Sequence, residues 1–89
     1  MPKLLFSERF AHDLARVSSE RVEKNIFRAL DNIESFPEIG SWLIPNSIRV
    51  EFGEGVRKYF VEPFDLVYTI SDDKATIYIE ALIDARAAW

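Results

Sequence analysis

The groups that could do chemistry lie in the second half of the chain, where charged and apolar residues alternate. This period of two predicts strands. If the strands are joined by two-residue turns, Asp65 lies opposite Glu80 on one sheet face, with Lys58 nearby. Two carboxylates so placed could share a proton or hold a hard cation. The simpler interpretation, which we favour, is a solvated strand face on which Lys58 is the counter-charge.

Two aromatic side chains fall on the same predicted face. Phe60 and Tyr78 alternate with core positions, so we expect both to be exposed. An exposed aromatic pair either marks a contact surface for a partner or covers a sheet edge. Periodicity places most of the remaining aromatics in the core, namely Phe6, Phe10, Phe36, Phe52, Phe64 and Tyr68.

Other kinds of site find little support in the sequence. His12 is the only histidine, and it lies off the apolar stripe of its helix, so we expect it at the surface. The chain has no cysteine, and no serine has a histidine partner in a recognisable pattern. The three glycines suit turns and loops rather than a nucleotide-binding loop. We therefore expect no metal and no cofactor.

The composition is that of one small domain. The 89 residues are 48% hydrophobic and 29% charged, which predicts a single domain over residues 1–89. The apolar runs are too short for a membrane span or a signal peptide, so we expect a cytoplasmic protein that makes no membrane contact. Eleven basic and fifteen acidic residues give a net charge of −4. Nucleic-acid-binding domains usually carry the opposite sign, so we expect no direct high-affinity binding of nucleic acid.

The first half of the chain predicts a short strand and two helices. Residues 3–6 form an apolar run that ends at Ser7, a good N-cap. Apolar residues then recur at helical spacing over 10–17 and, after Ser19, over 22–33. Pro37 ends the second helix. A connection this short predicts an antiparallel helix hairpin.

The second half predicts four strands, over residues 48–52, 56–61, 64–70 and 75–83. The expected fold is α+β, in the order β-α-α-β-β-β-β. An N-terminal strand and an antiparallel helix hairpin pack on one face of an antiparallel meander. The register places Arg57 opposite Tyr68 on the face that the helices cover. The other face is expected to be open and to carry the function; it includes Arg49, Glu51, Lys58, Phe60, Asp65, Val67, Thr69, Thr76, Tyr78 and Glu80.

Four segments spread over almost the whole chain carry a family resemblance. They are the opening Phe-Ser-Glu-Arg-Phe (6–10), the Phe-Pro-Glu-Ile-Gly loop (36–40), the hairpin over 55–68 and the closing Ile-Asp-Ala-Arg (83–86). Together they resemble the RelE/ParE toxin superfamily. The resemblance implies the growth-inhibiting toxin of a type II toxin–antitoxin pair, of the plasmid-stabilisation kind, with a cognate antitoxin as its partner.

Two branches of this superfamily imply different activities. RelE-like toxins are ribosome-dependent, metal-independent endoribonucleases, in which a strand lysine and two later arginines act on the scissile phosphate and the 2′-oxygen. Lys58 and Arg86 match the lysine and the last arginine, and Asp65 occupies the middle position. ParE-like toxins target DNA gyrase complexes. Their Gly-Leu-Arg-Arg run is similar to Gly-Val-Arg-Lys at 55–58, although Ile83 stands in place of a terminal histidine.

The ParE-like branch is the closer match, so we expect a toxin that binds a gyrase-type target and performs no chemistry of its own. Two alternatives stay open: a RelE-like mRNA endoribonuclease, with Lys58 and Arg86 as catalytic residues, and a non-toxic chain that binds only its antitoxin. Asp65 and the net charge disfavour the nuclease, because RNA cleavage needs cations around the phosphate. The residues expected to contact the target or the antitoxin are Arg57, Lys58, Phe60, Tyr78 and Arg86.

Overall fold

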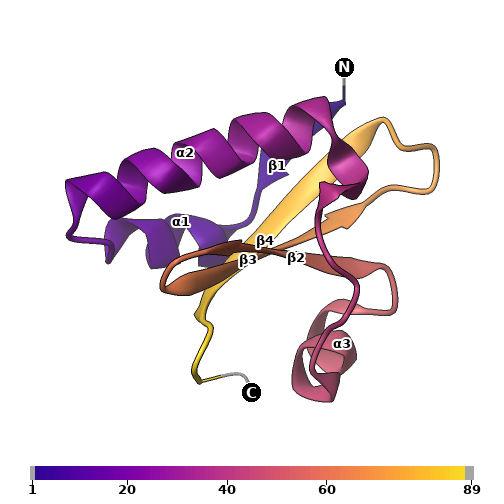
Figure 1. Ribbon diagram of the computed structural model, residues 1–89. Helices are drawn as coiled ribbons and strands as arrows, with labels where there is room; N and C mark the ends of the chain where they lie inside the picture. Colours follow the sequence, from indigo (N-terminus) through magenta and orange to yellow (C-terminus); the bar gives the residue numbers. More distant parts are fainter. Residues whose placement is uncertain (1, 88–89) are drawn as a thin grey trace.

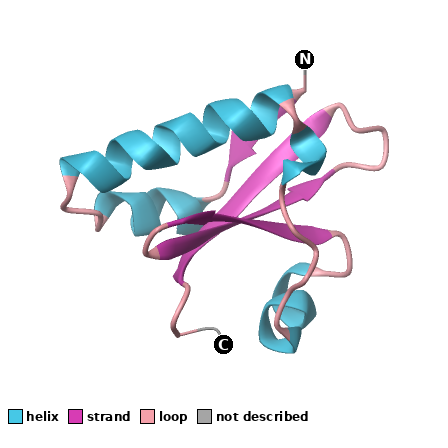
Figure 2. Cartoon of the chain, viewed as in Figure 1, coloured by secondary structure: helices cyan, strands magenta, loops and turns pink. Residues whose placement is uncertain are grey.

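A four-stranded sheet separates two helical layers in the computed structural model, which describes residues 2–87 (Figure 1). The chain runs through β1 (Lys3–Phe6), α1 (Glu8–Ala15), α2 (Glu20–Ser35) and the 3-10 turn η1 (Pro37–Ile39). It continues through α3 (Asn46–Phe52), β2 (Val56–Val61), β3 (Phe64–Ile70) and β4 (Thr76–Asp84). Helices α1 and α2 lie on one side of the sheet and α3 lies on the other (Figure 2).

The helix hairpin forms as predicted. Ser7 Oγ accepts a hydrogen bond from the Phe10 amide at 2.9 Å, and Ser19 Oγ accepts one from the Val22 amide at 3.2 Å. Each serine therefore caps a helix. Pro37 begins the 3-10 turn that follows α2. The α+β class and the packing of the hairpin on one sheet face are confirmed. No helix within residues 2–87 has the length and apolar character needed to cross a membrane.

The sheet is mixed rather than wholly antiparallel. Its strand order is β1-β4-β3-β2. Strands β2, β3 and β4 form the predicted antiparallel meander, but β1 pairs in parallel with β4. Parallel pairing requires a long crossover, and the helices between β1 and β2 supply it. The sequence pattern describes each strand by itself and so does not show which edge β1 joins.

The strand predicted over residues 48–52 is instead helix α3. Ile48, Val50 and Phe52 do alternate, but Val50 is 86% exposed. Ile48 is 4% exposed and Phe52 packs against the same cluster; the two lie four residues apart within α3, as one face of a helix requires. Over so short a run both periods fit the sequence, and the inward position of Ile48 and Phe52 with Val50 exposed favours the helix.

The register between β2 and β3 is the predicted one, with Arg57 opposite Tyr68. The register between β3 and β4 differs: Tyr68 pairs with Ile79, and Val67 pairs with Ala81. Glu80 is therefore an extra residue in β4, a β-bulge. The prediction assumed a two-residue turn before β4. The actual turn is longer and is closed by the hydrogen bond from the Ser71 amide to the Thr76 carbonyl at 2.9 Å.

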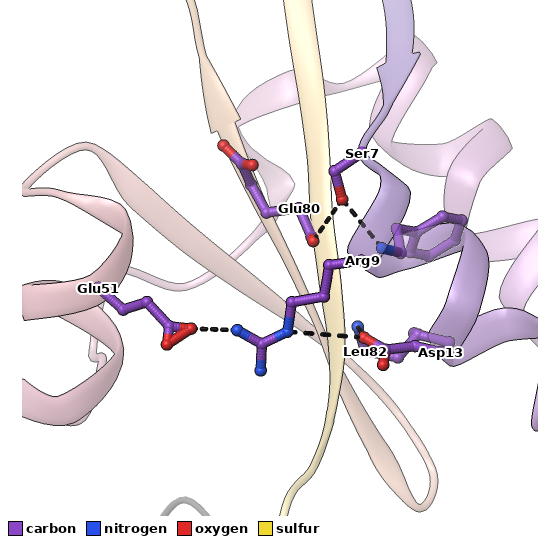
Figure 3. A network of polar contacts seen from close by, with 7 residues as sticks. Ser7, Arg9, Asp13, Glu51, Glu80 and Leu82 are labelled. Carbon is purple, nitrogen blue, oxygen red and sulfur yellow. Dashed lines mark hydrogen bonds and ion pairs between the residues drawn. The ribbon is translucent and has the colours of Figure 1, made fainter.

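Side chains of α1 and of its N-cap residue Ser7 occupy the edge of β4 where β1 ends (Figure 3). Ser7 Oγ donates to the carbonyl of the bulged Glu80 at 2.6 Å. Asp13 Oδ2 accepts a hydrogen bond from the Leu82 amide at 3.0 Å. Arg9 extends past β4 toward Glu51 of α3. These polar contacts fix α1 to the sheet beyond the end of β1.

The two bonds of Ser7 give a first prediction. We expect Ser7→Ala to lower the free energy of unfolding by about 1.5–3 kcal/mol, because the Phe10 amide and the Glu80 carbonyl both lose a partner. Ser19→Ala removes an exposed cap and should lower it by about 0.5–1 kcal/mol. Urea unfolding of both variants measures the difference. Equal losses would contradict the double role of Ser7.

Two hydrophobic clusters lie on opposite faces of the sheet. The main core, between the hairpin and the sheet, includes Phe10, Ile26, Ala29, Leu30, Ile33, Val61, Leu66, Tyr68, Ile77, Ile79 and Leu82. The second cluster lies between α3 and the face predicted to be open; it consists of Ile44, Ile48, Val56 and Val67, with Phe52 and Ile83 against it. That face is therefore partly covered, and Val67 is 0% exposed.

Phe6 and Phe36 are 54% and 67% exposed, contrary to the core positions that periodicity favours, because they lie at the ends of β1 and α2.

Candidate functional site

Lys58 and Asp65 form an ion pair on the sheet face that α3 partly covers. The Lys58 Nζ atom lies 3.9 Å from Asp65 Oδ2. The Asp65 side chain is 1% exposed and that of Lys58 is 17% exposed. Lys58 pairs with Val67, and Asp65 with Phe60, so the two charged side chains meet diagonally across β2 and β3. The predicted role of Lys58 as a counter-charge is confirmed for Asp65.

The predicted pairing of Asp65 with Glu80 is wrong. Asp65 lies opposite Ile83, because the longer turn before β4 shifts the register by two residues and the bulge shifts it by one more. The Glu80 carboxylate instead accepts a hydrogen bond from Thr69 Oγ1 at 3.0 Å. In the part of the chain that the structure describes, no three His, Cys, Asp or Glu side chains gather as metal ligands would. The two carboxylates therefore do not form a shared acid–base or cation site.

Phe60 and Arg86 line one hollow beside the edge strand β2. The hollow has a volume of about 230 Å³, and its lining also includes Glu62, Pro63 and Ala85. Phe60 is 60% exposed, as predicted. Arg86 Nη2 lies 3.3 Å from Asp84 Oδ2, and the Arg86 side chain is 85% exposed. The hydrogen bond between them, and then their charges, raise the pKa of Arg86.

Tyr78 and Arg57 lie apart from this hollow. Tyr78 is 42% exposed and pairs with Thr69 on β3 and with Leu5 on β1. Arg57 alternates with Lys58 along β2 and so belongs to the opposite face. The structure therefore brings Phe60 and Arg86 together and places Lys58 on the same face, two residues from Phe60. It does not gather all the predicted contact residues into one patch.

An exposed apolar surface between α2 and α3 was not predicted from the sequence. We call it the linker surface; it consists of Phe36, Ile39, Trp42 and Leu43, which are 67%, 46%, 68% and 80% exposed. Phe36 and Ile39 also line a hollow of about 380 Å³ at the end of α2. The available signal was a run of apolar residues between Pro37 and Pro45 that follows neither a helical nor a strand period.

Side chains from β2 and β3 hold the segment that carries the linker surface. Tyr68 Oη donates to the Pro37 carbonyl at 2.6 Å and accepts from the Gly40 amide at 2.8 Å. Arg57 Nη1 donates to the carbonyls of Glu38 and Gly40 at 3.2 and 3.0 Å. The Arg57 guanidinium also lies 4.7 Å from the centroid of the Trp42 ring. The linker surface is therefore presented on a fixed backbone.

The buried hydroxyl of Tyr68 makes the stability of the protein sensitive to alkaline pH. Desolvation by burial is the main reason that the pKa of Tyr68 is raised. The unfolded chain therefore loses this proton first, at about pH 10. The stabilisation is complete below the unfolded pKa and is lost as pH rises through the folded one. We expect stability to decline above about pH 10, and Tyr68→Phe to remove that part of the decline. Urea midpoints measured from about pH 8 to 11 test this, and parallel curves would contradict it.

The arrangement of a helix hairpin on one face of this sheet is a fold shared with solved structures of toxins. The isolated E. coli RelE toxin matches with a TM-score of 0.73 and 17% identity, over 96% of this chain and 85% of that one. A chain of the intact E. coli RelBE toxin–antitoxin complex gives a TM-score of 0.71 and 17% identity, over 96% and 98%. A chain of the RelBE2 toxin–antitoxin complex from Mycobacterium tuberculosis gives a TM-score of 0.71 and 21% identity, over 94% of this chain and 99% of that one.

The sequence itself identifies the family. The family model described as the ParE toxin of the type II toxin–antitoxin system, parDE, matches residues 4–89. The chain therefore belongs to the ParE toxin family, the toxins of type II toxin–antitoxin systems. This confirms the resemblance to the RelE/ParE superfamily. A comparison with curated proteins finds no match by sequence.

Proposed function

We propose that this toxin acts by binding a protein target of the DNA gyrase type, in the cytoplasm, and that a cognate antitoxin neutralises it. The observation that supports binding rather than RNA cleavage is the buried Lys58–Asp65 ion pair. The family model is that of parDE toxins. Two of the solved structures with this fold are complexes of a toxin with its antitoxin, which supports the antitoxin as partner.

The ion pair disfavours chemistry on a phosphate. Lys58 and Arg86 are the two cations that the nuclease interpretation requires, and each lies beside a carboxylate. At an effective dielectric constant of about 20, a carboxylate roughly 5 Å from a phosphate opposes its negative charge by about 3 kcal/mol. A loss of that size in the transition state slows a reaction by about two orders of magnitude. Asp65 stands where the nuclease branch has an arginine, so a stabilising cation is also lost.

The hollow beside β2 is suited to a protein contact. Phe60 offers an exposed aromatic ring and Arg86 an exposed guanidinium, two side-chain types that are enriched in the centres of protein interfaces. Both line the same concave surface. We therefore assign target contact to Phe60 and Arg86, and we assign Lys58 to holding Asp65 within the sheet.

The test measures two activities of the purified toxin side by side. We expect inhibition of gyrase supercoiling with accumulation of cleaved DNA, and no cleavage of mRNA in a reconstituted translation reaction analysed by primer extension. Cleavage at codons in the ribosomal A site, abolished by Lys58→Ala, would overturn the proposal in favour of the endoribonuclease. The partner is tested by co-expression with the adjacent reading frame, where a complex should elute as one species in size exclusion.

Variants of the hollow give a further prediction. We expect Phe60→Ala to raise the concentration needed for half-inhibition of gyrase by about tenfold or more, because a central aromatic contact is lost. Phe27→Ala is the matched control, since Phe27 is an exposed phenylalanine on α2, outside both the hollow and the linker surface. Both variants should keep the melting temperature within a few degrees. An unchanged inhibition curve for Phe60→Ala would remove the hollow from the target contact.

A further inference from the structure

Helix α3 is attached to the sheet separately from the main core. Ile44 and Ile48 pack with Val56 and Val67 in the smaller cluster, which shares no residue with the larger one under α1 and α2. Segments held by a small cluster of their own open at a lower free energy than the whole molecule. The contacts of α3 therefore permit it to leave the sheet while the main core stays folded.

The two ends of α3 suit such a movement. Its N-cap residue is Pro45, which makes no side-chain cap bond, and the helix ends at Gly53 with a φ angle of +100°. Arg49 donates to the Trp42 carbonyl and pairs with Glu54, so both of its contacts lie within the same segment. A helix of 7 residues has little stability by itself in water. The sheet and a contact from another element must therefore hold it.

That contact comes from α1, around the edge of the sheet. Arg9 forms an ion pair with Glu51 (Figure 3), and its guanidinium carbon lies 5.4 Å from the centroid of the Phe52 ring. Arg9 Nε also lies 3.9 Å from Asp13 Oδ2, which orients it on α1. The Arg9 and Glu51 side chains are 48% and 49% exposed, so salt screens their attraction. One side chain thus joins α3 to the opposite layer.

Beneath α3 lies the sheet face that carries Lys58. Lys58 lies between Val56 and Phe60 on β2 and pairs with Val67 on β3. We propose that α3 is a hinged cover over this face and that Arg9 is the latch that keeps it closed. Opening of α3 exposes Val56, Val67 and the side of the sheet next to Lys58 to solvent. The cover does not depend on the identity of the target, so failure of the gyrase assay leaves it unaffected.

Paired cysteine variants test the opening directly, because the natural chain has no cysteine. Val67→Cys places a thiol under α3, and Leu66→Cys places one on the opposite face under the main core; both positions are 0% exposed. Under native conditions we expect a thiol reagent to label Val67→Cys about tenfold faster or more. Equal labelling rates, each matching the rate of global unfolding, would overturn the proposal.

The latch is tested by adding Arg9→Gln to both reporters. We expect labelling of Val67→Cys to become about three- to thirtyfold faster, from loss of the ion pair and the cation–π contact, with Leu66→Cys unchanged. Arg21→Gln, at an exposed position on α2, is the matched control and should change neither rate. If Arg9→Gln accelerates both reporters equally, Arg9 stabilises the whole fold and is no latch.

Hydrogen exchange of the natural chain checks that the cysteine itself does not loosen α3. Amides of α3 should exchange faster than those of β3, and raising the salt concentration should accelerate α3 alone, because the latch is an exposed ion pair. Exchange of α3 at the rate of β3 would contradict the cover. A rate that does not respond to salt would contradict the ionic latch.

Discussion

Asp65→Ala is expected to lower the free energy of unfolding by about 2–4 kcal/mol, because it leaves a largely buried cation without its counter-charge. Asp65 is 1% exposed and lies 3.9 Å from Lys58 Nζ. Without the carboxylate, an ammonium group that is only 17% exposed would lose this ion pair. The small opening to solvent around Lys58 keeps the loss below that of a fully enclosed pair. Urea unfolding monitored by circular dichroism gives the value.

A double variant distinguishes the loss of the pair from the loss of packing. Lys58→Met combined with Asp65→Leu replaces both charges by apolar side chains of similar size, and such replacements are often neutral or stabilising. We expect the free energy of unfolding of the double variant to lie within about 1 kcal/mol of that of the natural chain. It should be clearly higher than the free energy of unfolding of either single variant. A double variant as unstable as the sum of the two single losses would show that the ion pair has no coupling energy.

Gly40→Ala is expected to cost a similar amount, about 2–4 kcal/mol, for a steric reason. An alanine Cβ at this position would lie 2.6 Å from Tyr68 Oη and 2.9 Å from the Lys58 carbonyl oxygen. Tyr68 is 0% exposed and cannot move aside without breaking its bonds to Pro37 and Gly40. The backbone at Gly40 has a φ angle of −71°, which every residue adopts, so conformational strain adds nothing.

Gly55→Ala is the matched control for this prediction. A Cβ at Gly55 would have no atom within 4 Å. We expect Gly55→Ala to change the free energy of unfolding by less than about 0.5 kcal/mol. Thermal and urea unfolding of both variants give the comparison. A loss below about 0.5 kcal/mol for Gly40→Ala as well would show that the segment after α2 adjusts without cost.

The sequence predicted correctly those elements whose ends are marked by a capping residue, a proline or a short turn and whose hydrophobic periodicity is clear. Ser7, Ser19 and Pro37 mark the bounds of the hairpin helices, and the short turn at 62–63 sets the register of β2 on β3. The prediction of a strand over residues 48–52 was wrong because Ile48, Val50 and Phe52 suit both periods. Only the burial of Ile48 against β2 and β3 decides between them, and that contact is remote in sequence.

The sequence predicted which residues belong to the candidate site better than it predicted how those residues are placed relative to one another. Exposure of Phe60 and Tyr78 and the pairing of Lys58 with Asp65 followed from strand alternation. The separation of Asp65 from Glu80 did not, because the turn before β4 is two residues longer than a tight hairpin turn and an extra residue in β4 shifts the later pairings by one more. A bulge of this kind leaves no mark in hydrophobic periodicity, since Ala81 and Leu82 are both apolar and suit either face.

Beyond the end of β1, the side chains of Ser7 and Asp13 take the place of a neighbouring strand as hydrogen-bond partners of β4. These contacts also affect how the protein behaves in solution. A strand with unpaired amide and carbonyl groups at the border of a sheet is a template for association with another chain. Past Phe6, the edge of β4 offers the Glu80 carbonyl to Ser7 and the Leu82 amide to Asp13. A backbone group of β4 that is already hydrogen-bonded to one of these side chains is not available to pair with another chain. The first turns of α1 therefore act as a guard against aggregation along this border of the sheet.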